Sequence, residues 1–219
     1  MSRTVEISAI VPVCEVVEPG TRLAREYLAA LEETGKSFEL AFVLDGAQKR
    51  FLDELGALAE EDSRIRIIQL AKTFGEAAAL SAGFEFTTGE IILTLPAYSQ
   101  VPPEAIGTVL AGLDQADVAV ACRRSGGGNG GGFQRMRRKL YNWAAFIASR
   151  ESFSDISCGV RAFKRDVADE LPLYGDQYRF FPILAARRGF KVREVPVDAA
   201  DGAALGQSHG PRVYLARLL

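Results

Sequence analysis

Carboxylate and guanidinium side chains follow some of the apolar runs in this sequence. Asp45 follows residues 38–44, and Arg123 and Arg124 follow residues 118–122. In an open α/β sheet, ligands bind beyond the carboxyl ends of the strands. A carboxylate there can accept hydrogen bonds from a nucleotide base or ribose, and arginine can grip a phosphate. An Asp-Gly turn and solvated surface charges are the structural alternatives for these same residues.

Residues 91–104 (IILTLPAYSQVPPE) are the segment around which this chemistry is expected to lie. Their apolar start predicts a buried strand, and Pro102-Pro103-Glu104 predicts the first turn of a helix. Residues 96–100 would then occupy the ligand-binding edge of the sheet. This edge segment contains no aspartate, glutamate, histidine or cysteine.

Composition excludes several classes of function. The chain has 219 residues, a net charge of −2 and one histidine, which argues against bulk nucleic-acid affinity and against a zinc site. No Walker ending follows the glycine-rich stretch, and nothing like GxGxxG follows the first apolar run, which disfavours NTPases and dehydrogenases. No apolar run approaches the length of a membrane span. Cys14, Cys122 and Cys158 are expected to be buried, reduced thiols.

Apolar runs of strand length alternate with stretches of helical periodicity, which predicts βαβ units and a mostly parallel, twisted sheet with helices on both faces. In the first helix Thr21 is expected to be the N-cap. In the helix expected over residues 75–86, small side chains would allow close packing on the sheet. Strands are expected at residues 5–13, 38–44, 65–70, 91–95, 118–122, 156–163 and 192–197, and helices at 21–31, 51–58, 75–86, 102–113, 133–150, 165–171 and 179–188.

Residues 126–132 (GGGNGGG) are expected to be a flexible loop, because glycine loses much conformational entropy on ordering. The basic amphipathic helix expected over residues 133–150 has two readings. Its arginines, tryptophan and tyrosine suit a membrane interface or a lipid-linked anion, and its apolar face equally suits packing on the sheet.

Several motifs carry a resemblance to a known family. Residues 72–80 (KTFGEAAAL) are similar to the family's "RNFGKEAAL", and residues 155–163 (DISCGVRAF), with Arg165, to "D-x-SCGFRAF-x-R". Residues 11–13 (VPV), 43–47 (VLDGA) and 194–197 (EVPV) match further segments in the same order. Together they resemble the family-2 glycosyltransferases of the GT-A fold, in particular the polyprenol-phosphate, dolichol-phosphate mannose synthase-like branch.

The resemblance implies a GT-A (nucleotide-diphospho-sugar transferase, Rossmann-like) domain over residues 1–197, followed by a loop and the start of a juxtamembrane helix over residues 198–219. It also implies two groups of site residues. The expected nucleotide-binding residues are Pro12, Val13, Glu15, Asp45, Lys72 and Gly75. The expected acceptor- or phosphate-binding residues are Arg123, Arg135, Arg138, Asp155, Ser157 and Arg161.

The chain departs from the family at the metal site. Residues 95–104 align with "LDADLQDPPE", whose DxD aspartates hold Mg²⁺ or Mn²⁺ in the family. Pro96 and Tyr98 stand at the aspartate positions, and of the matching ligands only Gln100 remains. Such hard cations need several oxygen ligands, mostly carboxylates, so no metal ion and no other cofactor is expected.

A second departure lies near the end of the chain. The family has "HHPRxxGxSKYG", in which an arginine and a lysine grip phosphates. Here Asp201-Gly202 and His209 stand roughly at those positions, with Gly206 and Ser208 retained in an offset register. Acidic and small residues therefore replace the cationic side chains that bind phosphate in the family.

Two functions follow from the resemblance and its departures. One is transfer of a sugar from a UDP- or GDP-type donor to a polyprenol phosphate or glycan, without the DxD metal. The alternative is a catalytically inactive homologue that binds a nucleotide, glycan or partner enzyme. We expect a cytoplasmic location, with peripheral contact at the inner face of the membrane and a homo-oligomer or partner enzyme as open alternatives, and no nucleic-acid partner.

Overall fold

A computed structural model describes residues 5–15, 18–124 and 153–200 of this protein. Within these residues, one sheet has seven strands in the order β3-β2-β1-β4-β6-β5-β7. The strands are β1 (Ile7–Val13), β2 (Phe38–Leu44), β3 (Ile65–Gln69), β4 (Ile91–Thr94), β5 (Val118–Arg123), β6 (Arg161–Lys164) and β7 (Val192–Val197).

Most neighbouring strands are parallel, as the sequence predicts. The pairs β1–β2, β1–β4, β2–β3 and β5–β7 are parallel, whereas β6 is antiparallel to both of its neighbours, β4 and β5. The short β6 therefore joins a four-stranded parallel part of the sheet to the pair β5 and β7.

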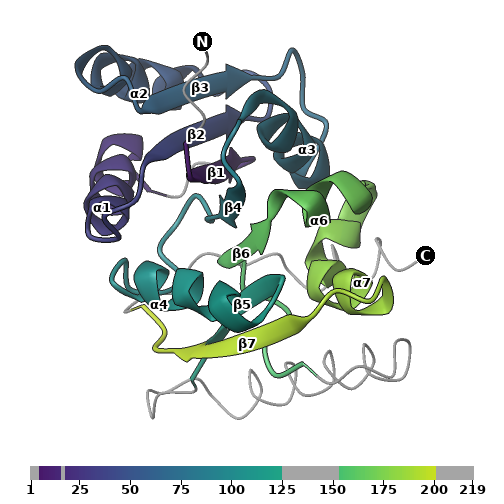
Figure 1. Ribbon diagram of the computed structural model, residues 1–219. Helices are drawn as coiled ribbons and strands as arrows, with labels where there is room; N and C mark the ends of the chain where they lie inside the picture. Colours follow the sequence, from purple (N-terminus) through teal and green to yellow (C-terminus); the bar gives the residue numbers. More distant parts are fainter. Residues whose placement is uncertain (1–4, 16–17, 125–152, 201–219) are drawn as a thin grey trace, which may run out of the picture.

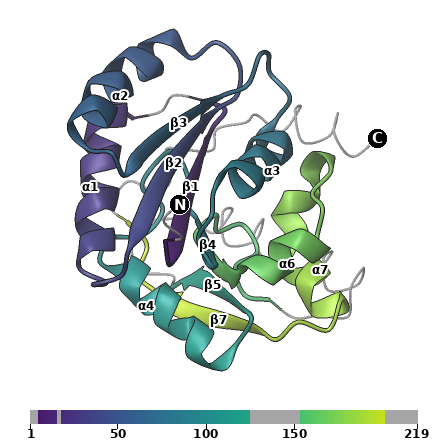
Figure 2. The same cartoon turned by 45° about the horizontal axis from the view of Figure 1, so that its top comes forward.

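Helices cover both faces of the sheet, as predicted (Figures 1 and 2). On one face lie α1, α2 and α4, and on the other α3, α6 and α7. The helices are α1 (Gly20–Glu32), α2 (Lys49–Glu61), α3 (Glu76–Phe86), α4 (Ala105–Ala111), α6 (Arg165–Glu170) and α7 (Phe181–Arg187), with 3-10 helices η1 (Gly112–Gln115) and η2 (Gly175–Phe180).

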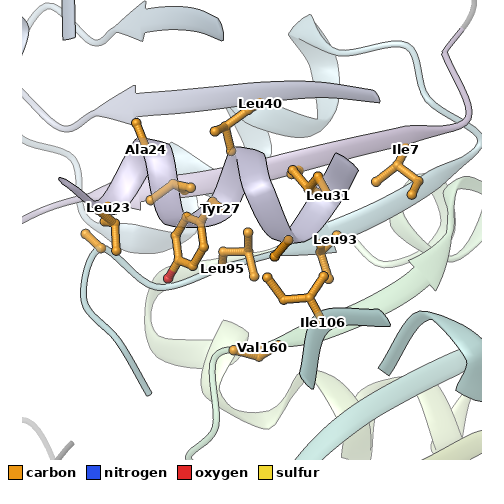
Figure 3. Packing of buried hydrophobic residues seen from close by; sticks show 14 of the residues in the cluster. Ile7, Leu23, Ala24, Tyr27, Leu31, Leu40, Leu93, Leu95, Ile106 and Val160 are labelled. Atoms are coloured by element: carbon orange, nitrogen blue, oxygen red, sulfur yellow. The ribbon is translucent and has the colours of Figure 1, made fainter. Parts of the chain in front are cut away.

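The core is centred on β1 and β2, in which every residue is buried. Figure 3 shows α1 packing Leu23, Tyr27 and Leu31 towards Leu93 and Leu95. A strand buried on both faces is expected to be apolar throughout, which explains the continuous apolar runs in the sequence.

Helix α3 packs close to the sheet because it carries small residues, which confirms the prediction for this helix. Ala77, Ala79 and Gly83 are buried against β1 and its neighbours. At Gly83 a Cβ atom would overlap the Cγ2 of Ile10 in β1. Glycine is thus the residue that permits this approach.

Several predicted boundaries are wrong for identifiable reasons. Helix α1 begins at Gly20 rather than after a Thr21 cap, because Glu54 of α2 accepts a hydrogen bond from the Gly20 N–H at 2.8 Å. The strand predicted over residues 156–163 is limited to β6, because residues 156–160 form a loop. In the last predicted helix, Pro182 lies in the first turn of α7 and a 3-10 turn precedes it. The predicted glycine loop and helix over residues 126–150 lie outside the described residues.

The cysteine prediction holds only in part. Cys158 is buried, but Cys14 and Cys122 are half-buried, and all three are free thiols. Each of the latter two lies at or next to the end of a strand. In the part of the chain that the structure describes, no helix combines the length and apolarity that a membrane crossing requires.

Substitution of Gly83 by alanine tests the packing of α3. The change Gly83→Ala should destabilise the protein by about 1–3 kcal/mol, because the added methyl group overpacks against Ile10. The matched control is Gly107→Ala in α4, where an added Cβ would meet no atom within 4 Å. That control should stabilise by about 0.5–1 kcal/mol through helix propensity. Urea unfolding measures both, and equal effects would contradict the packing argument.

Candidate functional site

The carboxyl ends of β1, β2, β3 and β4 meet at one edge of the sheet. The parallel register pairs Val13 with Leu44 and Leu44 with Gln69. The backbone continues the ladder beyond the strands, with Asp45 N donating to Val13 O at 3.0 Å and Leu95 N to Ile10 O at 2.9 Å. The segments after these strands therefore lie together, as the sequence analysis expects of a ligand-binding edge.

Asp45 holds the loop of residues 72–75. Its buried carboxylate accepts hydrogen bonds from the backbone N–H groups of Phe74, at 2.7 Å, and Gly75, at 2.9 Å. Gly75 has a φ of 98°, in the left-handed region that favours glycine. The observed role of Asp45 is thus to position this loop, and its direct contact with a nucleotide stays a prediction.

The loop presents a cation and an aromatic ring together. The Lys72 Nζ lies 5.2 Å from the centroid of the Phe74 ring, and 57% of Phe74 is exposed. Such a pair is a cation–π contact, which steadies the lysine head group at the edge of the site. Asp45 therefore anchors the loop that carries Lys72 and Gly75, both of which were predicted from the sequence.

The other predicted nucleotide contacts lie at the end of β1. Pro12 and Val13 are buried strand residues, whereas Glu15 is exposed beyond the strand. Burial, followed by the negative charges of Glu76, Asp45 and Glu15, raises the pKa of the intervening Cys14 to about 12. A thiol with this pKa is protonated at neutral pH and is a poor nucleophile or metal ligand.

The segment that aligns with the family's metal site is fixed by hydrogen bonds. The Pro96 carbonyl accepts a bond of 2.8 Å from the buried Tyr27 hydroxyl. The Gln100 Oε1 accepts a 2.8 Å bond from the Gly159 N–H, and its Nε2 donates to the Tyr98 hydroxyl at 2.5 Å. Gln100 is only 4% exposed. Its amide oxygen thus faces the backbone of the neighbouring loop.

The residues in this segment do not fit a divalent cation. Mg²⁺ and Mn²⁺ require several oxygen ligands, usually with carboxylates among them. Pro96 has no side-chain ligand, Tyr98 offers a neutral phenol, and the amide oxygen of Gln100 is engaged by Gly159. Among the described residues, no cluster of three or more His, Cys, Asp or Glu side chains is arranged to hold a metal ion.

Arg123, Asp155 and Ser157 form a compact ionic network beyond the end of β5. Asp155 Oδ2 lies 2.7 Å from Arg123 Nε, and Asp155 Oδ1 lies 3.0 Å from Nη2. The Ser157 hydroxyl accepts a 2.7 Å bond from Nη2 and donates to Asp155 at 2.8 Å. These three predicted acceptor-side residues are thus brought together.

The network is charged. Burial of Asp155 opposes ionisation, but the hydrogen bonds and the positive charge of Arg123 outweigh it and lower the pKa of Asp155. Burial likewise opposes the charge of Arg123, and Asp155 outweighs that effect and raises the pKa of Arg123. Both groups are therefore ionised at neutral pH as a fork-on-fork pair.

Arg161 does not have the placement expected of a phosphate ligand. Its guanidinium is buried and donates to the carbonyl oxygens of Cys158, Tyr178 and Ile156, at 3.0, 2.6 and 3.2 Å. Two of these carbonyls, those of Ile156 and Cys158, belong to the loop before β6, where buried backbone oxygens outside a strand need donors. Arg165 acts similarly, donating to Gly89 O at 2.6 Å and Phe84 O at 2.8 Å. In this structure the two arginines are structural residues.

Sequence reasoning missed some residues that position the site. Glu194 accepts hydrogen bonds from the N–H groups of Ser154, at 2.6 Å, and Asp155, at 3.2 Å. Glu194 lies in the motif of residues 194–197, so this motif could have pointed to its role. The hydrogen bond between Tyr27 and Pro96 joins residues 69 positions apart, and no local sequence pattern indicates it. Arg135, Arg138 and His209 lie outside the described residues.

The chain is similar in sequence to curated sugar transferases. The chain is 31% identical over 198 residues to the undecaprenyl-phosphate 4-deoxy-4-formamido-L-arabinose transferase of Enterobacter sp. (strain 638), covering 90% of this chain and 60% of that protein. It is also 31% identical over 209 residues to the enzyme of the same name from Pseudomonas fluorescens, covering 95% of this chain and 60% of that protein. The chain thus spans about 60% of the length of these relatives.

Solved structures share the fold at low sequence identity. Glucosyl-3-phosphoglycerate synthase from Mycobacterium tuberculosis, in complex with Mn²⁺, UDP and phosphoglyceric acid, has a TM-score of 0.71 at 16% identity, over 97% of this chain and 74% of that one. Mannosyl-3-phosphoglycerate synthase from Rubrobacter xylanophilus has a TM-score of 0.72 at 15% identity, over 98% and 70%. These similarities show that the fold is that of the GT-A glycosyltransferases.

The family follows from the sequence itself. The model of the family described as glycosyl transferase family 2 matches residues 8–172, which include the loop held by Asp45, the Pro96–Gln100 segment and the Arg123–Asp155 pair. Both named curated relatives are polyprenol-phosphate sugar transferases by name. The chain belongs to glycosyl transferase family 2.

Proposed function

We propose that this protein transfers a sugar from a nucleotide-sugar donor to a polyprenol phosphate or glycan acceptor without a metal ion at the DxD position. The observation that carries the proposal concerns the edge of the sheet at the carboxyl ends of β1 to β4. Its loops are held in place by hydrogen bonds, but the side chains of residues 96–100 do not fit a cation. Asp45 positions the Lys72 loop, while Gln100 bonds to Gly159 instead of facing a ligand.

On the donor side, positive charge comes from the protein. Lys72 stands on the anchored loop, and Arg135 or Arg138 takes the place of the metal ion against the diphosphate. Cations near a leaving diphosphate stabilise the charge that develops there, as a metal ion does in other enzymes. The nucleotide contacts include Glu15 and Asp45 and the backbone at Pro12, Val13 and Gly75.

On the acceptor side, Arg123 and Ser157 bind the phosphate, and on binding the Ser157 hydroxyl turns its hydrogen from Asp155 to the phosphate. The reaction requires an acceptor oxygen to attack the anomeric carbon while the bond from that carbon to the diphosphate breaks. An acceptor phosphate that is already ionised needs no general base for this attack. Asp155 then has a positioning role, because its carboxylate fixes the Arg123 fork and receives the Ser157 hydrogen until the phosphate binds.

The proposed partners are a UDP- or GDP-type sugar donor and a lipid-linked phosphate or glycan. The names of the curated relatives support an undecaprenyl-phosphate type of acceptor. A location in the cytoplasm at the inner face of the membrane would give access to both substrates.

A non-catalytic function is the second candidate, and one observation favours it. Neither the Pro96–Gln100 segment nor any described cluster of acidic, histidine or cysteine residues offers a metal site. In this reading the same edge binds a nucleotide or glycan, or a partner enzyme, without turning over a sugar.

Calorimetry with nucleotides tests the proposed donor site. UDP, GDP and their sugar conjugates should include a ligand that binds with the same affinity in Mn²⁺ and in EDTA, because the positive charge comes from side chains. Release of the product nucleotide in the presence of a polyprenol phosphate would support the transferase over the non-catalytic reading. Affinity that disappears in EDTA would contradict the metal-free site. Failure to bind any nucleotide would contradict both the transferase and the nucleotide-binding form of the non-catalytic function.

Restoring the acidic residues tests whether only the metal ligands are missing. The double variant Pro96→Asp and Tyr98→Asp should acquire Mn²⁺-dependent nucleotide affinity, because two carboxylates supply the oxygen ligands that the cation prefers. In EDTA its affinity should fall below that of the wild type, since two negative charges then face the diphosphate. Titration of UDP at fixed Mn²⁺ measures the gain. A folded variant that stays indifferent to Mn²⁺ would show a more extensively altered pocket.

A further inference from the structure

The Asp155 carboxylate is fully engaged within its own network. Its Oδ1 accepts hydrogen bonds from Arg123 Nη2, at 3.0 Å, and from the Ser157 hydroxyl, at 2.8 Å. Its Oδ2 accepts from the Arg123 backbone N–H, at 3.2 Å, and from Nε, at 2.7 Å. The oxygens of a carboxylate have about four acceptor positions, and all are used here. Asp155 therefore orients Arg123 and Ser157, and the location of its own backbone determines where both groups lie.

Arg123 retains donors that this network does not use. Its Nε and Nη2 groups donate to Asp155 and Ser157, whereas Nη1 has no acceptor among the residues that the structure describes. The Asp155 side chain is completely buried, and 18% of the Arg123 side chain is exposed. Asp155 thus anchors the guanidinium from the buried side and leaves the Nη1 hydrogens for an oxyanion, a ligand that a guanidinium binds strongly.

Glu194 in β7 holds the backbone from which the Asp155 side chain extends. One oxygen of its carboxylate, Oε1, accepts hydrogen bonds from the N–H groups of Ser154, at 2.6 Å, and Asp155, at 3.2 Å. Strand β7 also pairs in parallel with β5, in a register that places Val197 opposite Arg123. Strand β7 therefore positions both members of the ion pair, Arg123 through the strand ladder and Asp155 through the Glu194 side chain.

We infer that Glu194 is a positioning residue of the acceptor site, which acts on the phosphate through Asp155. The inference rests on the proposed function, because it concerns the site at which Arg123 and Ser157 bind that phosphate. Fixed donors bind a ligand more tightly than mobile donors, since the cost of ordering them is not incurred on binding. By anchoring the backbone at residues 154 and 155, Glu194 keeps the Asp155 carboxylate, and with it the Arg123 fork, in one arrangement.

The geometry of these hydrogen bonds also defines which substitutions preserve the anchor. Both N–H groups donate to the same oxygen of Glu194, so the amide oxygen of a glutamine can accept them in its place. Methionine has a side chain of similar length, but its thioether sulfur is only a weak acceptor. Glu194→Gln should therefore keep the anchor, and Glu194→Met should remove it.

Calorimetry in EDTA on the full chain tests the inference with two probes, farnesyl phosphate for the acceptor site and UDP for the donor site. Glu194→Met should weaken binding of farnesyl phosphate about tenfold or more, because the backbone that supports Asp155 loses its hydrogen bonds to a charged group. Binding of UDP should not change, and Glu194→Gln should bind both probes like the wild type. Glu194→Asp, whose carboxylate is shorter by one methylene group, is a milder variant and should show a smaller loss, again confined to farnesyl phosphate.

Glu6→Met is the matched control. Glu6 accepts a hydrogen bond of 2.9 Å from the Ser37 N–H, and it directly precedes β1, at the edge of the sheet opposite the proposed site. Its substitution removes the same kind of anchor, so it should lower the melting temperature and change neither affinity. If Glu6→Met weakened binding of farnesyl phosphate as much as Glu194→Met does, the effect would be general destabilisation, and the positioning role would be overturned.

The results separate this inference from the proposed function. If the wild type binds farnesyl phosphate and folded Glu194→Met and Glu194→Asp bind it equally well, the inference is wrong and the proposed function stands. An equal loss of both probes in Glu194→Met, or a loss in Glu194→Gln as large as in Glu194→Met, would also contradict the role of Glu194 as an anchor of the acceptor site. If the wild type does not bind farnesyl phosphate, the acceptor site of the proposed function fails and the inference fails with it.

Discussion

The buried hydrogen bonds of Arg161 stabilise the short strand β6, and the rest of the sheet depends on β6 because it connects the two parallel parts. Strand β6 is antiparallel to both neighbours and connects β4 to β5, yet it comprises only residues 161–164. The loop that leads into it is not part of a strand, and Arg161 satisfies the carbonyl groups of Ile156 and Cys158 within that loop. A guanidinium with its fixed fork of donors can satisfy several carbonyls at once, which explains why an arginine occupies this buried position. Replacement by lysine would not reproduce that geometry.

The same principle recurs around the site, because three backbone segments there are each held by a buried polar side chain. Asp45 receives the N–H groups of residues 74 and 75, Gln100 receives that of Gly159, and Asp155 receives that of Arg123. An unpaired backbone group buried in such a loop would cost about 1–3 kcal/mol, so these anchors are required for the frame whatever the chemistry. Residues that match a family motif can therefore serve the fold itself, independently of any bound ligand.

The difference between local packing and contacts made by residues distant in the sequence explains how much of the protein could be predicted from the sequence. The strands around β1 and β2 and the close approach of α3 were predictable, because continuous apolar runs and small helical residues report local packing. The segment of residues 96–100 was placed at the ligand edge by the same logic. The role of Arg161 was not predictable, because its partners include the carbonyl of Tyr178, and a motif does not say whether an arginine faces a ligand or the backbone. The prediction that Thr21 caps the first helix was wrong for a related reason, since the N–H of Gly20 at the helix start donates to Glu54 of another helix.

Charge is the constraint that connects these observations to function. Two aspartates and a divalent ion are together neutral, and the ion acts on a diphosphate because it lies closer to it than the aspartates do. In this chain Pro96 and Tyr98 stand at the aspartate positions, so without an ion the segment places no uncompensated carboxylate at this edge of the sheet. The segment is instead neutral, with an amide and a phenol that hydrogen-bond to each other. A segment without charged side chains does not repel a phosphate, although each hydrogen bond that it makes contributes less than a bound ion would. Under the proposed function, such a site would favour ligand binding over strong stabilisation of a leaving group, so the affinity for nucleotides and the rate of sugar transfer would have to be measured separately.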